Sequence, residues 1–535
     1  MTVVAAESTT TPGMAHQHDV AIVGSGFSGL AMAVRLREEG IESFVVLERG
    51  DDVGGTWRDN SYPGCACDVP SHLYSLSFAP NPEWSSTFSP QGEIHAYLRD
   101  VAQRHGVLPH VRFGCELQGA AWVEHQQRWQ LETSAGSLSA RVLILAAGPL
   151  SEPSVPELPG IERFTGTTFH SAEWDHDHDL TGKRVAVIGT GASAIQFVPR
   201  IQPRVARLHV FQRTAPWVLP RRARRLSRLE RAVYRRVPAA QRLMRAGIYW
   251  ARELYAVPLL RASLAPLTRR LGRSYLRRQV PDLELRRKLT PSYAPGCKRI
   301  LISNDYLPSL ARPNVELVTD GIAEVRERSI VTTGGTEHDV DTIIFGTGFR
   351  VTDFPIAHAV RGRGGRLLAD VWQGSPRAHR GATVAGFPNM FFLLGPNTGL
   401  GHTSVVVMAE AQAGYVREAL RHMRSHVAGA LEVRAEAQEA WNAELQRAMR
   451  GTVWTAGGCA SWYIDSTGTN TTLWPGFTFR FRRLLRRFDA ESYVCRPATA
   501  ASAGVPTSAP SAARTPSPSA PCSGTSSVPA SARTG

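Results

Sequence analysis

Lysine and paired cysteines are scarce in this chain of 535 residues, and long apolar runs are absent. No stretch of about 18 uncharged apolar residues occurs, so we expect no membrane-spanning helix. The seven cysteines are scattered and form no C-x-x-C pair, which argues against a zinc ribbon, a thioredoxin-type site and a disulfide framework. The first residues lack the basic and apolar stretches of a secretory signal. We therefore expect a reduced, soluble, cytoplasmic protein without a metal centre.

Positive charge is concentrated in one segment. The formal net charge is +15, and residues 213–299 hold 23 Lys and Arg against 4 Asp and Glu. Such a segment indicates either an anionic partner or a helical insertion with solvated arginines, since leucines and aromatic residues recur through 226–260 as in an amphipathic helix. No nucleic-acid-binding motif accompanies the charge. We expect no nucleic acid partner, and at most a weak peripheral membrane contact through 213–299.

Strand-like and helical runs alternate along most of the chain, which is typical of an α/β protein with parallel sheets. The two ends differ from this pattern. Residues 1–17 are polar, and 31 of the last 40 residues are Ala, Ser, Thr or Pro. Such compositions bury too little apolar surface to fold, so we expect disorder at 1–17 and at 495–535.

Two short segments share one glycine pattern. DVAIVGSGFSG (19–29) and VAVIGTGASA (185–194) each read as a buried strand, a tight turn and the start of a helix. The first glycine allows the turn, the second lets a pyrophosphate approach the backbone, and the third small residue lets the helix pack on the strand. The sequence therefore predicts two dinucleotide-binding sites. Their turn residues are Gly24, Gly26 and Gly29, and Gly189, Gly191 and Ala194.

The second strand of each unit predicts which dinucleotide it binds. FVVLERG (44–50) reaches Glu48, 24 residues after Gly24, and LHVFQRT (208–214) reaches Arg213, 24 residues after Gly189. A carboxylate at this position accepts a hydrogen bond from the ribose 2′-OH, whereas an arginine binds a 2′-phosphate. We therefore predict FAD at the first site and NADPH at the second, with electrons passing between them.

Two longer strings carry a resemblance to a known family. FTGTTFHSAEWD (164–175) matches F-x-G-x-x-x-H-x-x-x-W-[PD], and GGTWRDNSYPGCACD (54–68) matches [AG]-G-x-W-x-x-x-x-[FY]-P-[GM]-x-x-x-D. Together with the glycine turns, they make the chain resemble the class B flavoprotein monooxygenases, and among them the type I Baeyer–Villiger monooxygenases. The resemblance runs from about residue 18 to 494. The fixed positions of the first string are Phe164, Gly166, His170, Trp174 and Asp175.

The resemblance implies an activity and its catalytic residues. One oxygen atom of O2 would be inserted beside a ketone carbonyl, through a flavin C4a-peroxide, to give an ester or lactone. Arg299 in CKRI would stabilise the anionic peroxide, because an arginine stays charged and gives up no proton. Asp68 would orient Arg299 near the flavin, and His170 would couple domain movement to turnover.

The resemblance also implies further binding residues. Lys298 and Thr214 would join Arg213 on the 2′-phosphate, and Trp462 would line the substrate pocket. The remaining cofactor-binding residues would be Ser28, Thr56, Trp57, Asp68, Tyr74 and Gln196. We interpret Cys65 and Cys67 as small packing residues, and HDHD (176–179) as a solvated turn and not a metal site.

The predicted architecture has two Rossmann-like domains. Residues 18–150 and 345–494 would form the FAD domain, and 151–344 an inserted NADPH domain with a basic helical insertion at about 217–290. Two other functions stay open. One is a flavin monooxygenase that oxidises nitrogen or sulfur, and the other is a peripheral membrane or binding protein with degenerate nucleotide folds. The intact glycine turns, with Glu48 and Arg213, argue against the latter.

Overall fold

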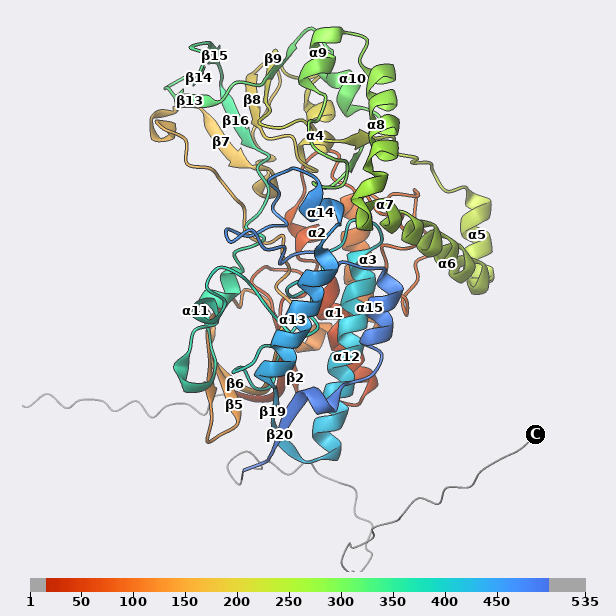
Figure 1. Ribbon diagram of the computed structural model, residues 1–535, viewed down its shortest axis with the longest axis vertical. Coiled ribbons are helices and arrows are strands. Elements are labelled where there is room, and N and C mark those ends of the chain that lie inside the picture. Colours follow the sequence, from red (N-terminus) through yellow and green to blue (C-terminus); the bar gives the residue numbers. More distant parts are fainter. Residues whose placement is uncertain (1–15, 500–535) are drawn as a thin grey trace, which may run out of the picture.

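The computed structural model describes residues 16–499, with a mixed sheet in the lower half of Figure 1 and a parallel sheet in the upper half. The lower sheet has the strand order β17-β4-β5-β6-β1-β2-β3, and β18 also pairs with β6. Its β1–β2, β1–β6 and β6–β18 pairs are parallel, whereas β4, β5 and β6 form an antiparallel meander. The strands are β1 (His16–Val23), β2 (Phe44–Leu47), β3 (Val111–Arg112), β4 (Leu117–Val123), β5 (Arg128–Thr133), β6 (Gly136–Leu145), β17 (Val360–Arg361) and β18 (Met390–Phe392).

The upper sheet is entirely parallel, with the order β12-β9-β8-β16-β7. All four residues of β16 are buried, as expected for a strand covered on both faces. Because the chain enters this sheet after β6 and leaves it before β17, the upper unit is inserted into the lower one. The strands are β7 (Thr167–His170), β8 (Arg184–Ile188), β9 (Arg207–Phe211), β12 (Val315–Val318) and β16 (Thr342–Phe345).

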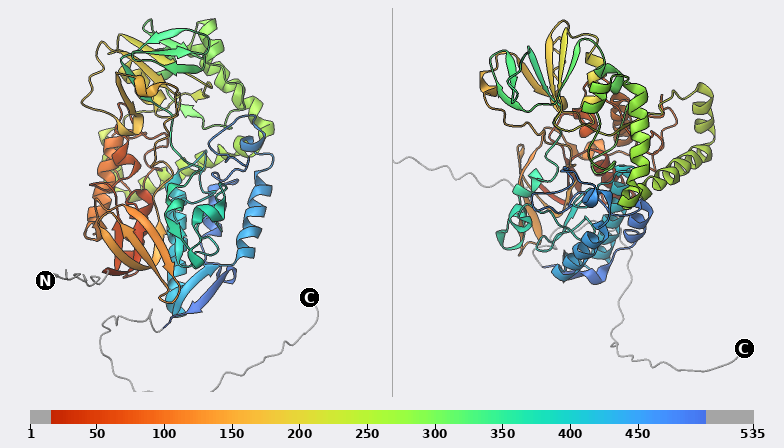
Figure 2. Two further views of the ribbon diagram at one scale, coloured as in Figure 1. Left: turned by 90° about the vertical axis from the view of Figure 1, so that its left-hand side faces the viewer. Right: turned by 45° about the horizontal axis from the view of Figure 1, so that its top comes forward.

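Helices cover the lower sheet and the side of the molecule. The long helix α12 (Val405–Ser425) packs against α1 (Phe27–Glu38), near α3 (Gln91–Arg104), α13 (Ala435–Met449) and α15 (Thr478–Leu484) (Figure 1). The basic segment is helical, as predicted, and its α5 and α6 project from the body in Figure 1 and in the right-hand view of Figure 2. Its helices are α5 (Arg228–Arg236), α6 (Pro238–Leu254), α7 (Ala256–Leu260), α8 (Ala265–Gln279) and α9 (Leu283–Lys288).

The predicted α/β class with two Rossmann-like units is confirmed, and the domain boundaries near residues 150 and 345 stay predictions. The ends of the ordered chain were predicted wrongly. Strand β1 begins at His16, and β20 (Tyr493–Pro497) pairs with β19 (Ala428–Val433). Residues 495–497 are thus held by strand pairing, which a compositional argument cannot detect. The rest of both predicted tails, 1–15 and 500–535, lies outside the described residues.

The expectation of fully reduced cysteines is also wrong. Cys297 and Cys459 form a disulfide between residues 162 positions apart in the sequence. No local spacing signals such a pair, so only the fold reveals it. Cys65 and Cys67 are buried free thiols, and burial raises the pKa of both, to about 11 for Cys65. Their interpretation as packing residues is consistent with this. Between residues 16 and 499, no helix is long and apolar enough to cross a bilayer.

Candidate functional site

The first glycine turn joins β1 to α1 in the lower sheet. Gly24 has φ +98°, a backbone conformation that favours glycine, and a Cβ on Gly29 would lie 1.9 Å from the Gly24 carbonyl oxygen. A Cβ on Gly26 would meet no atom closer than 3.9 Å. The N-terminus of α1 has no side-chain cap and no acidic residue in its first turn. The turn therefore leaves room and unpaired N–H groups for a pyrophosphate, which fits a dinucleotide. Ser28 is buried in this first turn of α1.

Glu48 lies just beyond the end of β2, beside this turn. Its Oε2 accepts hydrogen bonds from the Ser25 N–H at 3.0 Å and hydroxyl at 2.6 Å, and its Oε1 accepts from Arg58 at 2.7 Å. Burial raises the pKa of the Glu48 carboxyl, but the hydrogen bonds outweigh burial and hold it below its usual range. The position thus carries a fixed negative charge, which suits a ribose hydroxyl and disfavours a 2′-phosphate.

The second glycine turn joins β8 to α4 (Ala194–Ile201) in the upper sheet. Gly189 has φ +108°, and a Cβ there would lie 2.4 Å from the Gly346 carbonyl oxygen. The nearest atom to a Cβ on Gly191 would be 3.8 Å away, and Ala194 is fully buried. The first turn of α4 holds no acidic residue, and its N-cap makes no side-chain hydrogen bond. This turn fits a second pyrophosphate.

Two cations lie close together beside the second turn. Arg213 follows β9 and is exposed, and Lys298 follows the disulfide residue Cys297. Burial, and then the charge of Arg213, lower the pKa of the Lys298 ammonium. Within residues 16–499, neither side chain makes a hydrogen bond or an ion pair with a carboxylate, so no acidic group neutralises these two neighbouring charges. Such a pair is suited to an anion such as a 2′-phosphate. Thr214 lies beside them, and its carbonyl accepts from Thr190 at 3.4 Å.

Arg299 and Asp68 are 231 residues apart in the chain and form an ion pair between the two units. The Arg299 Nε and Nη2 donate to Asp68 Oδ2 at 2.9 and 2.6 Å. Both side chains lie deep in the protein yet keep about a third of their surface open, 33% for Arg299 and 28% for Asp68. Burial raises the pKa of the Asp68 carboxyl, but the charge and hydrogen bonds of Arg299 outweigh it, so Asp68 stays ionised. Asp68 raises the pKa of Arg299 further. The pair therefore offers fixed opposite charges that are partly exposed.

Three neighbours of this pair were not predicted from the sequence. Arg252 of α6 donates to the Asp68 carbonyl at 3.2 Å, and Arg221 donates to the Cys67 carbonyl at 3.1 Å. Tyr463 is buried, and burial raises its pKa to about 12, against the opposing charge of Arg299. All three come from segments far apart in the sequence, so no local motif contains them.

Aromatic side chains stand next to the first turn. The Trp57 Nε1 donates to the Tyr74 hydroxyl at 3.0 Å, and the two rings meet edge to face with centroids 5.5 Å apart. The Phe27 ring lies 5.1 Å from that of Tyr74. Burial raises the pKa of Tyr74, so it stays a neutral phenol. Thr56 begins the short helix α2 (Thr56–Asp59) that holds Trp57. These residues form an apolar wall where a flavin was predicted.

Gln196 bridges the two units. On α4 of the upper unit, its side chain accepts from the Ala66 N–H at 2.9 Å and donates to the Ala66 carbonyl at 3.2 Å. The structure thus places this predicted cofactor residue in a contact with the segment that leads to Asp68. Gln196 therefore joins the two units through two hydrogen bonds.

The residues of the first long string lie between the units. His170 ends β7, is buried, and accepts from the Ala172 N–H at 3.1 Å. Burial lowers its pKa, so the ring is neutral and unsuited to donate a proton. Its ring lies 5.8 Å from that of Phe349, in the segment where the chain returns to the lower sheet. This position is compatible with domain coupling.

Among the other fixed residues of that string, Trp174 lies at the same junction. The Trp174 ring lies 5.2 Å from that of Phe197, and the Phe197 ring lies 6.0 Å from that of Tyr62 in the lower unit. A Cβ on Gly166 would lie 2.6 Å from the Phe164 ring. The Asp175 carboxylate accepts from the N–H groups of Asp177 and His178, both at 3.1 Å, so HDHD forms a turn.

Trp462 lies in the segment that the disulfide attaches to Arg299. Cys459 is three residues before Trp462, and Cys297 is two residues before Arg299. Trp462 is 44% exposed, and its ring contacts that of Tyr463, with centroids 4.3 Å apart. The disulfide therefore tethers the predicted substrate segment to the ion pair.

One cluster of metal-ligand type lies elsewhere on the upper unit. His209, Glu316 and His338 bring ligand atoms within 4.8 Å of one another. However, Arg207 already contacts the same Glu316 oxygen at 3.1 Å, and the His209 Nδ1 lies 3.2 Å from that oxygen. The cluster is an ion pair of Arg207 and Glu316 with two imidazole rings packed on it, and it lies on the β9–β12 side of the sheet, not at the glycine turn.

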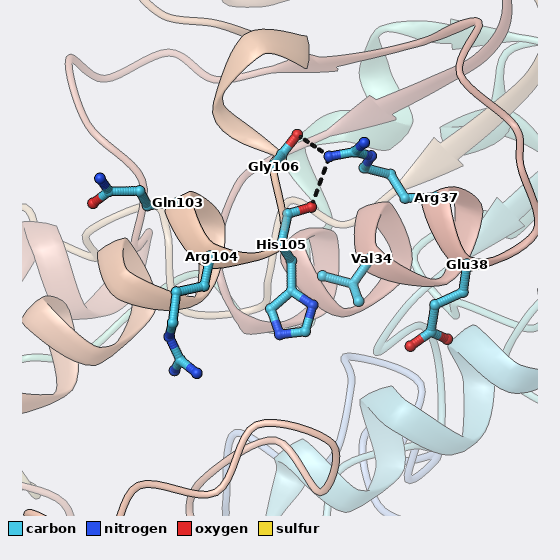
Figure 3. A pocket seen from close by; sticks show the side chains of 7 residues that line it. All are labelled: Val34, Arg37, Glu38, Gln103, Arg104, His105 and Gly106. Atoms are coloured by element: carbon cyan, nitrogen blue, oxygen red, sulfur yellow. Dashed lines mark hydrogen bonds between the residues drawn. The ribbon is translucent and has the colours of Figure 1, made fainter.

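A surface hollow of about 400 Å³ is also remote from the site. It lies at the C-terminal end of α1, opposite the glycine turn, and Figure 3 shows Arg37 donating across it to the His105 and Gly106 carbonyls at 2.9 and 2.8 Å. These hydrogen bonds engage the guanidinium of Arg37, so we assign no chemical role to the hollow.

The chain is similar over most of its length to proteins of known family. Residues 17–241 match the family model described as flavin-binding monooxygenase-like. The chain is 53% identical over 491 residues to a Streptomyces coelicolor protein named Baeyer-Villiger monooxygenase, covering 91% of this chain and 94% of that protein. A Pseudomonas aeruginosa protein of the same name is 50% identical over 496 residues, covering 92% of this chain and 94% of that protein.

Solved structures are similar over the same length. A steroid monooxygenase bound to NADP has a TM-score of 0.81 and 32% identity, covering 90% of this chain and all 100% of that one. A closed form of cyclohexanone monooxygenase has a TM-score of 0.82 and 26% identity, covering 91% of this chain and 100% of that one. Because each match covers about nine tenths of this chain, both Rossmann-like units have counterparts in these two structures.

Proposed function

We propose, from the premise that this chain belongs to the family of Baeyer–Villiger monooxygenases, that Arg299 and Asp68 are its catalytic pair and that its substrate is a ketone. The chain is an FAD-dependent monooxygenase that uses NADPH for Baeyer–Villiger oxidation. The observation that supports the pair is the double hydrogen bond from Arg299 to one oxygen of Asp68, with both side chains partly exposed.

When bound, FAD reduced by NADPH supplies the oxygen-transfer chemistry with O2. One oxygen atom enters the ketone to give an ester or lactone, the other leaves as water, and NADPH supplies the two electrons. Arg299 keeps a positive charge where negative charge develops on the substrate carbonyl oxygen, which stabilises the transition state by on the order of 3 kcal/mol. Because its pKa is raised further by Asp68, Arg299 does not act as a proton donor. Asp68 orients the guanidinium.

The remaining assignments are part of the same proposal. Glu48 and the first glycine turn hold the FAD adenosine, and Arg213 and Lys298 hold the NADPH 2′-phosphate. The neutral ring of His170, at the junction of the units, couples their movement to turnover.

The test is a substrate panel with the purified holoenzyme. Linear, cyclic and aryl ketones, an amine and a sulfide are each incubated with NADPH under ¹⁸O2, and products are identified by mass spectrometry. We expect one ¹⁸O atom in an ester or lactone, and NADPH oxidation that rises when a ketone is added. Products from the amine or sulfide alone would show that the substrate proposal is wrong.

A further inference from the structure

Helix α6 exposes an apolar stripe to solvent and turns polar side chains toward the protein. Its outward stripe consists of Leu243, Gly247, Trp250 and Leu254, at the i, i+4, i+7, i+11 spacing of one helix face. Leu243 is 75% exposed, Trp250 56% and Leu254 72%. A helix that only covers a protein core would bury such a stripe. Within the described residues, 12 of the 19 exposed large hydrophobic side chains lie between Leu229 and Leu283.

The inward face of α6 is polar and tied to the active site. Arg245 donates to the carbonyls of His72 at 2.8 Å and Ser75 at 2.9 Å, and Arg252 donates to that of Asp68. Glu253 is buried, lies 3.5 Å from His402, and accepts from the N–H and hydroxyl of Thr478 at the start of α15. These contacts fix the orientation of the helix, so the apolar stripe cannot turn inward without breaking them.

The exposed surface continues onto α15. The Phe479 ring lies 6.0 Å from that of Trp250, and Arg482 lies over the Tyr249 ring at 5.7 Å. Helix α15 exposes Phe479 and Leu484 among arginines. We call this surface the docking face. It consists of Leu243, Met244, Trp250, Leu254, Phe479 and Leu484, with the exposed cations Arg242, Arg480, Arg482 and Arg483.

Charge decides which partner fits the docking face. The only acidic residue in α6 and α15 is Glu253, which is buried. A second copy of this chain would therefore bring arginine against arginine, which is unfavourable. The segment 500–535 contains two arginines and no acidic residue, so it does not complement the face either. Exposed leucine and tryptophan surrounded by arginine are suited to an anionic phospholipid surface, where the apolar groups enter the headgroup region and the cations stay at the phosphates.

We propose that the docking face binds anionic membranes and that the enzyme takes lipid-soluble ketones from them. The second half rests on the proposed function, whereas the binding itself does not. Asp68 contacts Arg252 on the inward face of α6, and the outward face of α6 would touch the lipid. Asp68 and the lipid surface would therefore be separated by about one helix diameter, roughly 10–12 Å. A ketone dissolved in the membrane would have a short path to the site.

Binding is tested by flotation of the full-length holoenzyme with vesicles of phosphatidylcholine, with or without phosphatidylglycerol. We expect roughly tenfold or greater enrichment on the anionic vesicles, weakened by high salt. The double variant Trp250→Ser/Leu254→Ser should reduce this enrichment about tenfold. Leu283→Ser is the matched control, because Leu283 is 64% exposed in the same basic segment but lies outside the docking face. It should bind like the wild type.

The same samples separate this proposal from the proposed function. Turnover of a water-soluble ketone should be equal in the wild type and the double variant, because neither residue contacts Asp68 or Arg299. Equal vesicle binding by both proteins, or none by the wild type, would overturn the docking proposal. A dimer that dissociates in the double variant would also overturn it, by showing that a second copy covers the face. Vesicle binding without ketone turnover would leave docking supported and refute the substrate proposal.

Discussion

The guanidinium of Arg299 and the carboxylate of Asp68 meet through two hydrogen bonds to a single oxygen, Asp68 Oδ2. This geometry leaves Oδ1 and the third guanidinium nitrogen, Nη1, without a part in the pair. The arginine is thus fixed in orientation by Asp68 while part of its fork stays available to a ligand. A point charge on a flexible lysine stem cannot reproduce this arrangement.

Arg299→Ala should therefore slow ester formation strongly while the protein keeps its flavin. We expect the rate of ester formation to fall about 10²–10³-fold, because the developing negative charge loses its counter-charge. Bound flavin should persist, since Gly24, Gly29 and Glu48 are unchanged. Stopped-flow absorbance follows flavin reduction and reoxidation, and mass spectrometry follows the ester. Arg299→Lys should recover only part of the activity, and near-wild-type ester formation in either variant would remove Arg299 from the catalytic pair.

Arg213→Ala should change cofactor preference. In our proposal the 2′-phosphate of NADPH binds at Arg213 and Lys298, whose like charges it would offset, so removing Arg213 should weaken the binding of NADPH and not of NADH. One charge-assisted contact contributes about 1.5–3 kcal/mol, which predicts a ten- to hundredfold higher KM for NADPH. Arg207→Ala, also an exposed arginine of the upper unit, is the control and should leave both KM values unchanged. An equal loss with NADPH and NADH would contradict the assignment.

Two truncations should differ sharply in stability. A chain ending at Thr499 keeps β20 and the hydrogen bond from Gln127 Nε2 to the Pro497 carbonyl at 2.9 Å. A chain ending at Cys495 removes these contacts and the ion pair of Arg496 with Glu432. We expect the longer chain to keep wild-type flavin content and melting temperature, and the shorter one to melt several degrees lower. Identical melting curves would show that the end of β20 adds nothing.

Loss of the Cys297–Cys459 disulfide should destabilise the protein by about 2–5 kcal/mol, because the bridge closes a long loop of the unfolded chain. Cys459→Ser should lower the urea midpoint, and a reductant should lower the wild-type midpoint to a similar value. Cys495→Ser is the matched control, since Cys495 is a free exposed thiol. A wild-type midpoint insensitive to reductant would contradict a stabilising disulfide.

Acid should destabilise the protein through His209. Burial, and then His338, lower the pKa of His209 from 6.5 to about 4. The unfolded chain therefore binds a proton that the folded chain does not between these two pH values. The free energy of unfolding is at its full value above pH 6.5 and falls as the pH drops toward 4, by up to about 3 kcal/mol.

The test compares His209→Gln with His125→Gln. His125 is exposed, so its replacement should leave the fall in stability unchanged, whereas His209→Gln should flatten it. Urea denaturation at pH 7 and pH 4.5 measures the difference. The same fall in both variants would assign the acid sensitivity to other groups.

The sequence by itself determined the parts of this protein that depend on local chemistry. A tight turn needs glycine at Gly24 and Gly189, and helix packing needs a small residue at Gly29 and Ala194. Each turn can therefore be predicted from about a dozen consecutive residues. The identity of the dinucleotides followed from Glu48 and Arg213 at a fixed distance along the same unit. The ion pair of Arg299 with Asp68 came from resemblance to a family, because nothing local joins residues 231 positions apart.

Only the tertiary structure decided the rest. Tyr463 and Arg252 reach the ion pair from other segments, and Cys297 meets Cys459 through the packing of two distant loops. The periodicity of α6 predicted an amphipathic helix but not which face points inward. Buried contacts of Arg245 and Glu253 turn its polar face to the core, so the apolar stripe lies outside. Orientation of this kind depends on partners that the local sequence does not contain.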